Sequence, residues 1–433
     1  MYIDCGMSGG SNGAFRSCHV SVKFSVCCIV IDIHRSYRWH SLHDRGYNSV
    51  IDLAKTKLNP TLNFRVDIIA QLACVGIRIG LDIHPSRQTA RQIEVELVRA
   101  YMRVVFTVSE SLDAVRTGTP SEPVVAEAAA RLINSEVNFQ ELPPRVLARA
   151  FEKGYVADGE RAEMVGRLLW TLAHDTALRY TPWRDTVHYH KPLSVINFLK
   201  SLFHQDHWNT ILNARPLDNE DGPPLLQAFK DAYIHFSHFV DGRGCKVMQL
   251  EEVYKLLLRG AALHCDRKNG SINFLAPILF GPPDSTAISL SASSVLQAQV
   301  SNYDNPGDVF LSSTFINSAN QQPVLSLVHQ LGSSKHSVEC DGPAYVITST
   351  KDKKNAPPHY QVVAHGCSSA MYGVIPEGEN RTYAELLQPH LHMEEVPHRY
   401  IRGYGVDMAN WMDPAFGLEQ GNGGCEWFGE EME

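Results

Sequence analysis

The sequence predicts an α+β protein in which an α-helical region precedes a small mixed-sheet domain. Two observations support this prediction. Apolar residues recur at helical spacing between residues 61 and 263, and from residue 271 they form short apolar or alternating runs between Gly, Pro, Asn and Ser clusters. A chain of 433 residues with 44% hydrophobic residues has enough material for two or three domains with buried cores.

Residues 1–60 are expected to form a degenerate or poorly structured segment, because no helical period persists in them. Within this segment, residues 6–13 follow a short apolar piece, as a phosphate-binding loop would. Such a loop needs a lysine for the phosphates and a hydroxyl residue for magnesium. Asn12 stands at the lysine position and Gly13 at the hydroxyl position, so a flexible Gly/Ser segment is the better interpretation.

Residues 61–245 are predicted to form an α-helical domain. Pro123 follows a turn and suits the first turn of a helix. Four apolar stripes at helical spacing define further helices: Val95, Val98, Met102 and Val105; Val165, Leu168, Leu169 and Leu172; Ile196, Leu199, Leu202 and Phe203; and Phe229, Ala232, Tyr233 and Phe236.

Residues 246–390 are predicted to form the α+β domain, and residues 391–433 an acidic, disordered tail. A helix with Leu250, Val253, Tyr254, Leu257 and Leu258 leads the domain. Five runs predict its strands: 272–280, 294–300, 324–331, 344–348 and 360–364. In the tail, nine acidic residues against two arginines give residues 394–433 a net charge of −7.

The charge and cysteine patterns narrow the class of protein. The net charge is −8, which leaves only −1 outside the tail, so global charge does not favour nucleic-acid binding, although a local basic face stays open. The ten cysteines form no CxxC pair, which is typical of a reduced, intracellular protein, cytoplasmic or nuclear. No segment approaches the ~20 apolar residues of a membrane span, so no membrane association is expected.

The order of several segments resembles an uncharacterised fungal family related to the Crinkler class, whose members join a P-loop NTPase to a restriction-endonuclease-like domain. The segments cover most of residues 65–375, and here the NTPase part would be incomplete. The resembling stretches are residues 120–130, 166–175, 229–232, 259–265, 272–278 and 295–302.

This resemblance implies a nuclease-type core with a D…(E/Q)xK set of residues on two strands. Asn273 stands at the aspartate position, Gln299 at the glutamate or glutamine position, and Ser301 at the lysine position. The aspartate and its partner would hold a divalent cation through oxygen atoms, and the lysine would add positive charge. No charged group remains in this set, so catalysis is expected to fail.

A displaced acid is the alternative. Glu251 and Glu252 lie on the predicted helix before the strands, and Asp266 and Asp284 flank the first strand. One such acid, Glu252 or Asp284, would restore a Mg²⁺ site. The plainer interpretation is that these acids are solvated surface charges.

The 20 histidines include pairs at close spacing: His204 with His207, His235 with His238, His188 with His190, and His390 with His392. Zinc requires three or four converging ligands, and no Cys/His spacing repeats, so structural roles are expected, with His235 and His238 at the border of a core.

Two further patterns have plain interpretations. Residues 366–369, Gly-Cys-Ser-Ser, lack the second glycine of a nucleophile elbow and are predicted to be a turn. The arginines of a predicted helix are interrupted by Glu94 and Glu96 and suggest a charge-balanced exposed face; they are Arg87, Arg91, Arg99 and Arg103.

Three functional hypotheses follow. The first is a catalytically inactive, nuclease-like remnant that acts as a binding or interaction module, without a cofactor. The second is a divalent-metal-dependent nuclease with a displaced acid, the only case that calls for Mg²⁺. The third is a protein–protein adaptor that uses the helical region. Nucleic acid and protein both stay open as partners.

Overall fold

The computed structural model describes residues 47–83, 88–108, 115–135, 142–156, 161–179, 188–217, 219, 221–242, 250–265, 272–282, 289–302, 322–340 and 357–388. Several sequence predictions concern residues outside these ranges: the loop 6–13 and the rest of 1–46, the strand 344–348, the tail 391–433, Arg87, Asp266, Asp284, His390 and His392.

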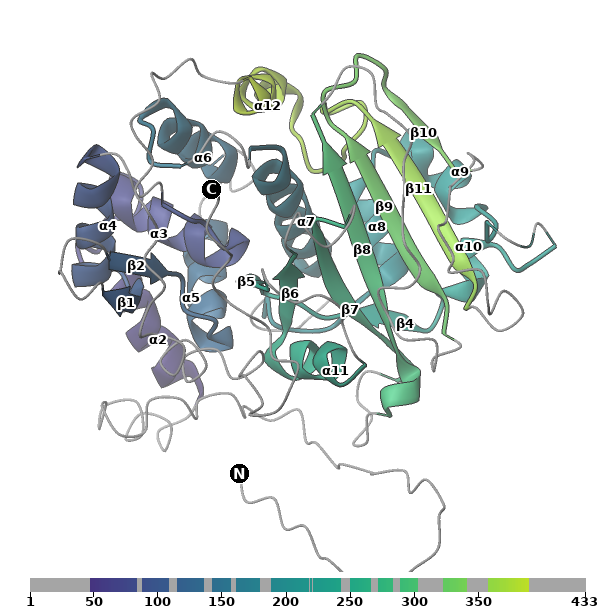
Figure 1. Ribbon diagram of the computed structural model, residues 1–433, viewed down its shortest axis with the longest axis horizontal. Helices are drawn as coiled ribbons and strands as arrows, with labels where there is room; N and C mark the ends of the chain where they lie inside the picture. Colours follow the sequence, from purple (N-terminus) through teal and green to yellow (C-terminus); the bar gives the residue numbers. More distant parts are fainter. Residues whose placement is uncertain are drawn as a thin grey trace, which may run out of the picture.

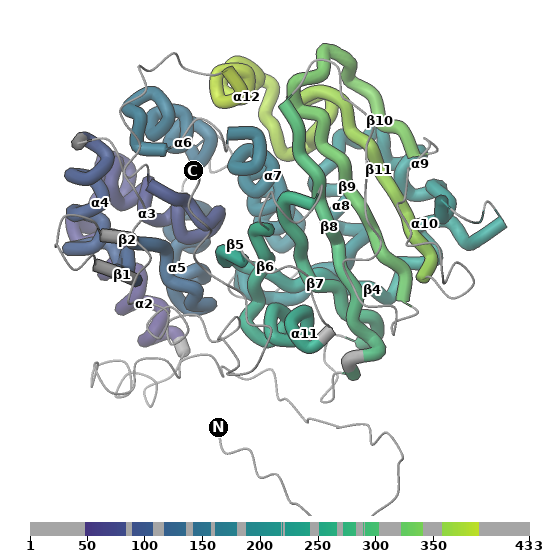
Figure 2. The backbone as a smooth tube through the Cα atoms, viewed as in Figure 1, coloured from purple at the N-terminus to yellow at the C-terminus, as the bar shows by residue number. Residues whose placement is uncertain are grey.

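The first part of the described chain is mostly helical (Figure 1). Its elements are α2 (Tyr47–Leu58), α3 (Ile68–Ile79), α4 (Gln88–Ala100), β1 (Val104–Val108), β2 (Val115–Gly118), α5 (Pro123–Asn134), α6 (Leu142–Glu152) and α7 (Arg161–Arg179). Pro123 is at the start of α5, as predicted, where its missing N–H costs no helical hydrogen bond. The longest helix, α7, lies between the other helices and the sheet (Figure 2).

The second part contains the sheet, so the protein has the predicted α+β fold. Its elements are β3 (Leu193–Ser194), α8 (Val195–Leu202), η2 (Gln205–His207), α9 (Trp208–Leu212), α10 (Leu225–Ala228), β4 (Ala232–Ile234), β5 (His238–Asp241), α11 (Leu250–Arg259), β6 (Ala261–His264), β7 (Phe274–Phe280), η4 (Leu290–Ala292), β8 (Ser293–Ser301), β9 (Val324–Gln330), β10 (Ser337–Glu339), β11 (His359–His365), η6 (Glu377–Glu379) and α12 (Asn380–Leu387).

The sheet is mixed. Its main path runs β10-β11-β9-β8-β7-β4-β3, while β6 pairs with β7 beside β4 and carries β5 at its other edge. The strand pairs β8–β9, β9–β11 and β5–β6 are parallel, and the other pairs are antiparallel. The predicted strands 272–280, 294–300, 324–331 and 360–364 are confirmed as β7, β8, β9 and β11.

The two faces of the sheet differ in character. One face packs against α7 and α8 with apolar side chains of alternate positions, such as Leu296, Ala298 and Leu327. On the other face, α11 covers β6, β7 and the start of β8 with Val253 and Leu256. Farther from α11, this second face carries polar side chains between the buried valines Val324, Val328 and Val363. We call these polar positions the polar face; they are Gln297, Gln299, Ser301, Ser326, Gln330, His359, Gln361 and His365.

Two glycines allow the close approach of α7. A Cβ atom on Gly166 would lie 2.9 Å from Val300 and 3.0 Å from Phe274, so the helix could not sit this close to β7 and β8 with a larger residue. Gly80 ends α3 in the left-handed conformation, with φ 63°, and its carbonyl accepts a hydrogen bond from Arg167 of α7 at 3.0 Å. The helical region and the sheet are therefore tied together by α7.

The predicted domain boundary at residues 245/246 is wrong. Strands β3, β4 and β5 precede it, yet β4 pairs with β7 and β5 pairs with β6. One hydrophobic core also extends from Val50 to Leu387. The boundary failed because the stripe at residues 229–236 suggested a helix. This segment follows α10 and contains the short strand β4, and a short buried strand has no diagnostic period.

Two other sequence predictions need correction. Within the segment 1–60, residues 47–58 form helix α2, which buries Val50, Ile51, Ala54 and Leu58. The predicted helix through Val105 ends at Ala100, because Val105 belongs to the hairpin of β1 and β2. Met102, between them, has a positive φ of 65°, which no helix continues.

Candidate functional site

The antiparallel register of β7 and β8 brings the three nuclease-type positions together. The last described pair is Phe274 with Ala298, so Asn273 comes next to Gln299 at the same end of the two strands. Ser301 follows two residues later on the same face of β8, beyond Gln299. The sequence positions therefore form one group at the carboxyl end of β8.

The side chains in this group are neutral, and one of them is already engaged. Asn273 Oδ1 accepts a hydrogen bond from the backbone N–H of Val300 at 2.6 Å. The backbone of Asn273 also donates to Ala298 and accepts from Cys265, at 2.8 and 2.7 Å. The Asn273 amide thus ties the start of β7 to β8, which leaves its oxygen less available to an ion.

Gln299 differs from Asn273, since its side-chain oxygen is buried and finds no hydrogen-bond partner among the described residues. The oxygens of Gln330 and Gln361, on the same polar face, share this property within the described chain. A buried acceptor without a donor costs free energy, so these three oxygens are prepared to accept hydrogen bonds from a bound group or from water.

Another part of the polar face satisfies its own hydrogen bonds. Gln297 Nε2 donates to Ser326 Oγ at 2.7 Å, and Ser326 Oγ also hydrogen-bonds with His359 Nε2. These side chains come from β8, β9 and β11 and are buried. Gln297, Ser326 and His359 therefore join three strands, and the burial of the serine argues against a nucleophile that reaches substrate.

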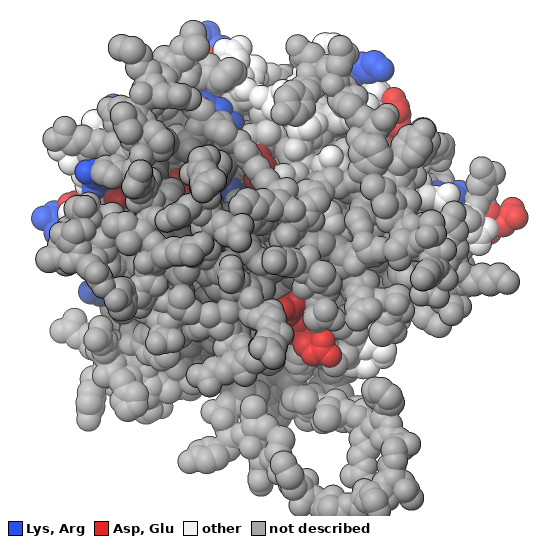
Figure 3. Space-filling view, viewed as in Figure 1, with Lys and Arg blue, Asp and Glu red and all other residues white. Residues whose placement is uncertain are grey.

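Glu252, the proposed displaced acid, is half-buried in the first turn of α11, and its neighbour Glu251 is exposed. Because α11 packs on β6, β7 and β8, Glu252 lies on the same side of the sheet as Gln299 and Ser301. Figure 3 shows acidic side chains at the surface where α11 lies in Figure 1. Asp284 and Asp266 lie outside the described residues.

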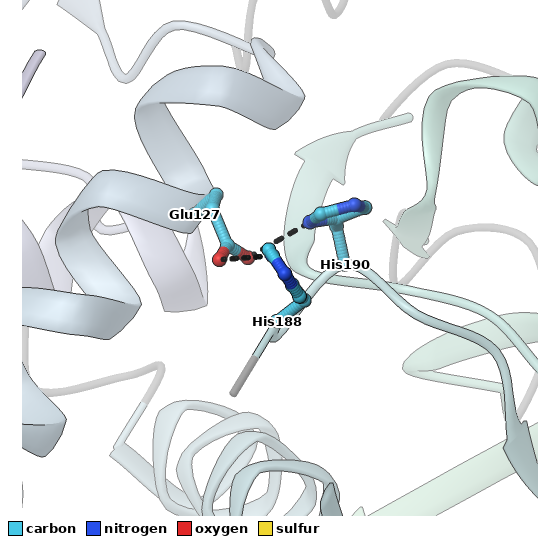
Figure 4. Close-up of side chains that lie close together, drawn as sticks. All are labelled: Glu127, His188 and His190. Atoms are coloured by element: carbon cyan, nitrogen blue, oxygen red, sulfur yellow. Dashed lines mark hydrogen bonds and ion pairs between the residues drawn. The ribbon is translucent and has the colours of Figure 1, made fainter. Parts of the chain in front are cut away.

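A second group of chemically active residues lies between α5 and the turn before β3 (Figure 4). Glu127 points from α5 toward His188 and His190, and the metal-ligand atoms of the three lie within 4.8 Å of one another. His190 Nδ1 is 3.1 Å from Glu127 Oε2, and Arg131 Nε donates to Glu127 Oε1 at 2.7 Å. Arg131 Nη2 also lies 2.9 Å from His188 Nδ1.

The Glu127 carboxylate is fully buried and charged. Burial opposes its ionisation, but the hydrogen bonds and charges of His190 and Arg131 outweigh burial and hold the pKa of Glu127 below its usual value. Burial also lowers the pKa of His188, against the opposing effect of Glu127. The group therefore combines a buried anion, a guanidinium and a neutral imidazole.

The sequence indicated only half of this group. The spacing of His188 and His190 was visible, but Glu127 comes from a helix about 60 residues earlier. Its spacing of four residues from Arg131 is that of an ordinary helical ion pair and does not point to a site. A glutamate among the apolar positions of α5, with Ala126 and Ala128 also fully buried, was the signal that could have revealed it.

The other histidine pairs have structural surroundings. His235 and His238 are buried at the border of the core as predicted, but they lie before and within β5, not on a helix. Burial lowers the pKa of His235 to about 4 and that of His238 to about 3. His204 and His207 flank and end the short helix η2, where His207 Nε2 contacts the carbonyl of Ala370 at 2.9 Å.

Residues 366–369 follow β11 directly and lead into a turn in which the N–H groups of Met371 and Tyr372 donate to the carbonyl of Ser368. Gly366 has a φ of 91°. Burial raises the pKa of the Cys367 thiol to about 12, so the reactive thiolate is not formed at neutral pH. This residue is therefore unsuited to nucleophilic catalysis.

The predicted arginine face is only partly present. Arg99 is exposed and pairs with Glu96 at 2.8 Å, which fits a charge-balanced surface. Arg103 lies beyond the end of α4 and is buried, where it donates to Thr117 and to the carbonyl of Leu81. These two arginines do not share one exposed face.

Comparisons with known proteins add a family but no activity. A family model described as a domain of unknown function (DUF8736) matches residues 63–363, from just before α3 into β11. No curated protein and no solved structure matches the chain. Among the residues that the structure describes, no helix has the length and apolar character needed to cross a bilayer.

Proposed function

The chain belongs to the DUF8736 family, and we propose that it is a catalytically inactive nuclease-like protein that acts as a binding or interaction module. The observation that carries the proposal is the position of Asn273, Gln299 and Ser301 at one end of β7 and β8. A D…QxK nuclease would have an aspartate and a lysine at two of these positions. Here all three side chains are neutral.

The neutral side chains at these positions are expected to prevent metal-assisted phosphodiester cleavage. Magnesium is held by carboxylate and carbonyl oxygens, and metal-assisted phosphodiester cleavage needs the ion to activate water and offset the developing charge. The Asn273 oxygen already accepts from Val300, and Ser301 cannot supply the positive charge of a lysine. We therefore expect no catalysis at this sheet end.

The capacity to bind is supported by what the polar face still offers. The side-chain oxygens of Gln299, Gln330 and Gln361 have no hydrogen-bond partner within the described part of the chain, and they are neutral acceptors on three adjacent parallel strands. Such acceptors suit a partner with N–H or O–H donors, and both nucleic acids and proteins have such donors. The resemblance to intracellular, Crinkler-like fungal proteins with endonuclease-like domains makes nucleic acid the first partner to test.

The proposal predicts that restoring the two charges restores metal binding. In the double variant Asn273→Asp/Ser301→Lys, the carboxylate keeps its acceptor for the Val300 N–H and adds a charged ligand beside Gln299. Calorimetric titration with Mg²⁺ or Mn²⁺ should give a clear binding signal for this variant and none above background for the wild-type protein. Adding Gln299→Ala to the double variant should remove the gain.

A matched control places the same substitutions apart from each other. Asn48→Asp on α2 with Ser337→Lys on β10 makes the same change in charge on two elements without a shared site. This control should titrate like the wild type. A double variant that folds but binds no more metal than the control would contradict the assignment of the three positions.

A further inference from the structure

We propose that Glu127, His188 and His190 form a binding site for a divalent transition-metal ion of the zinc class. In the metal-free protein, the guanidinium of Arg131 takes the place of the cation. This site lies between α5 and the turn before β3 and is separate from the group at Asn273, Gln299 and Ser301.

The distances suit a common ion. Two ligand atoms bound to a tetrahedral zinc at about 2.0–2.1 Å are about 3.3 Å apart. His190 Nδ1 and His188 Nδ1 lie 3.1 and 3.9 Å from the nearest oxygens of Glu127, on either side of that value. The ligand atoms of the three residues all lie within 4.8 Å of one another, so small side-chain adjustments would bring them around one ion. Both imidazoles lie beside the carboxylate of Glu127 (Figure 4).

The hydrogen bonds fix which nitrogens can serve as ligands. Arg131 can only donate, so His188 Nδ1 accepts from it, carries no proton and has a lone pair that points into the group. The ionised Glu127 can only accept, so His190 Nδ1 donates to it in the metal-free protein. Metal binding requires His190 Nδ1 to lose this proton, which can pass to solvent because the side chain is 35% exposed.

The donor set selects the class of metal. Two imidazole nitrogens and one carboxylate suit zinc and its neighbours among the transition metals, whereas magnesium and calcium prefer oxygen ligands throughout. Three protein ligands leave a fourth position open. Glu127 is fully buried while the histidines are partly exposed, so an ion would enter from the histidine side and meet a fixed carboxylate.

Arg131 gives the proposal its sharpest test, because it competes directly with the ion. Its guanidinium bonds both the Glu127 carboxylate and the lone pair of His188. Since its side chain is 17% exposed and lies in the last turn of α5, it can turn toward solvent when a metal binds. Removing the guanidinium should thus free two ligands and one negative charge.

The test is a zinc titration of the full-length protein against a chromophoric chelator, with thermal unfolding in parallel. The wild-type protein should bind one Zn²⁺ ion at this site, and Arg131→Met should bind it about tenfold or more tightly. His188→Ala and His190→Ala should each weaken binding by at least about tenfold. Zinc should raise the Tm of the wild type and of Arg131→Met, and should have less effect on the histidine variants.

Background binding to other histidines is controlled by His204→Ala. His204 lies 3.3 Å from Asp206 and has the same 35% exposure as His190, but no third ligand joins this pair among the residues that the structure describes. Its loss should leave zinc binding unchanged. The proposal is overturned if His188→Ala and His190→Ala bind zinc like the wild type, or if Arg131→Met gains no affinity. In either case the group is a structural ion pair only.

Discussion

Replacing Asp175 by asparagine is expected to lower the free energy of unfolding by about 3–5 kcal/mol, because the substitution leaves a buried guanidinium without its counter-charge. Arg78 of α3 donates to both carboxylate oxygens of Asp175 of α7, at 2.8 and 2.6 Å, and both side chains are at most 2% exposed. Arg78 also donates to the carbonyl of Ser237, and Asn134 of α5 donates to Asp175 at 2.8 Å. One carboxylate therefore joins α3, α5 and α7.

Urea unfolding of Asp175→Asn and of a double variant distinguishes the cost of an unpaired buried charge from the cost of altered packing. Arg78→Met/Asp175→Leu removes both charges together and should cost less than Asp175→Asn alone, since no unpaired charge is left buried. A single variant that loses less than about 1 kcal/mol would contradict a central role for this pair.

The same pair predicts a dependence on pH. Burial raises the pKa of Asp175, but Arg78 and His174 outweigh it and lower the pKa to about 2. The stabilisation is therefore fully present above the unfolded-state pKa of about 3.9 and is lost as the pH falls toward 2. The stability difference between the wild type and Asp175→Asn should narrow over this interval.

Replacing Trp170 by alanine is expected to lower the free energy of unfolding by about 3–5 kcal/mol. Trp170 of α7 is fully buried, and its ring meets the edges of Phe274 and Phe198 with centroids 4.8 and 5.6 Å apart. Its Nε1–H donates to His329 Nε2 at 3.1 Å. The substitution would leave a cavity between α7, α8 and the sheet and would remove this donor.

Trp170→Phe separates these two contributions. Phenylalanine keeps most of the ring packing but leaves His329 Nε2 without its donor. Trp170→Phe should therefore lower the free energy of unfolding clearly less than Trp170→Ala does. Trp208→Ala is the matched control, since Trp208 on α9 is only partly buried. Equal losses for Trp170→Ala and Trp208→Ala in chemical unfolding would show that the core is not centred on Trp170.

The elements that could be predicted from the sequence are those whose signal is local. Strand β7 was visible as a short apolar run between polar segments. Strands β8, β9 and β11 were visible because Gln, Ser or His interrupts their apolar residues. Pro123 marked the start of α5 by its own geometry. The pairing of β7 with β8 followed as well, because consecutive antiparallel strands are the commonest neighbours.

The features that could not be predicted depend on contacts between distant residues. Because β4 pairs with β7, the sheet contains strands from both sides of the predicted domain boundary. The sequence of residues 232–234 alone does not indicate a strand. Glu127 meets His188 and His190 only after α5 packs beside the turn before β3. The sequence predicted that Asn273 and Gln299 lie on neighbouring strands. It did not predict the hydrogen bond from the Val300 N–H to Asn273 Oδ1, because this bond depends on the exact register of β7 and β8.

Incubation of the purified full-length protein with plasmid DNA and Mg²⁺ or Mn²⁺ tests whether the sheet end at Asn273, Gln299 and Ser301 is catalytically inactive. We expect no metal-dependent cleavage above a protein-free control, because Asn273, Gln299 and Ser301 supply no charged group to hold the metal ion at this end of the sheet. Metal-dependent cleavage that disappears in Glu252→Gln but persists in the exposed neighbour variant Glu251→Gln would contradict this expectation, and would identify Glu252 as the displaced acid of an active nuclease.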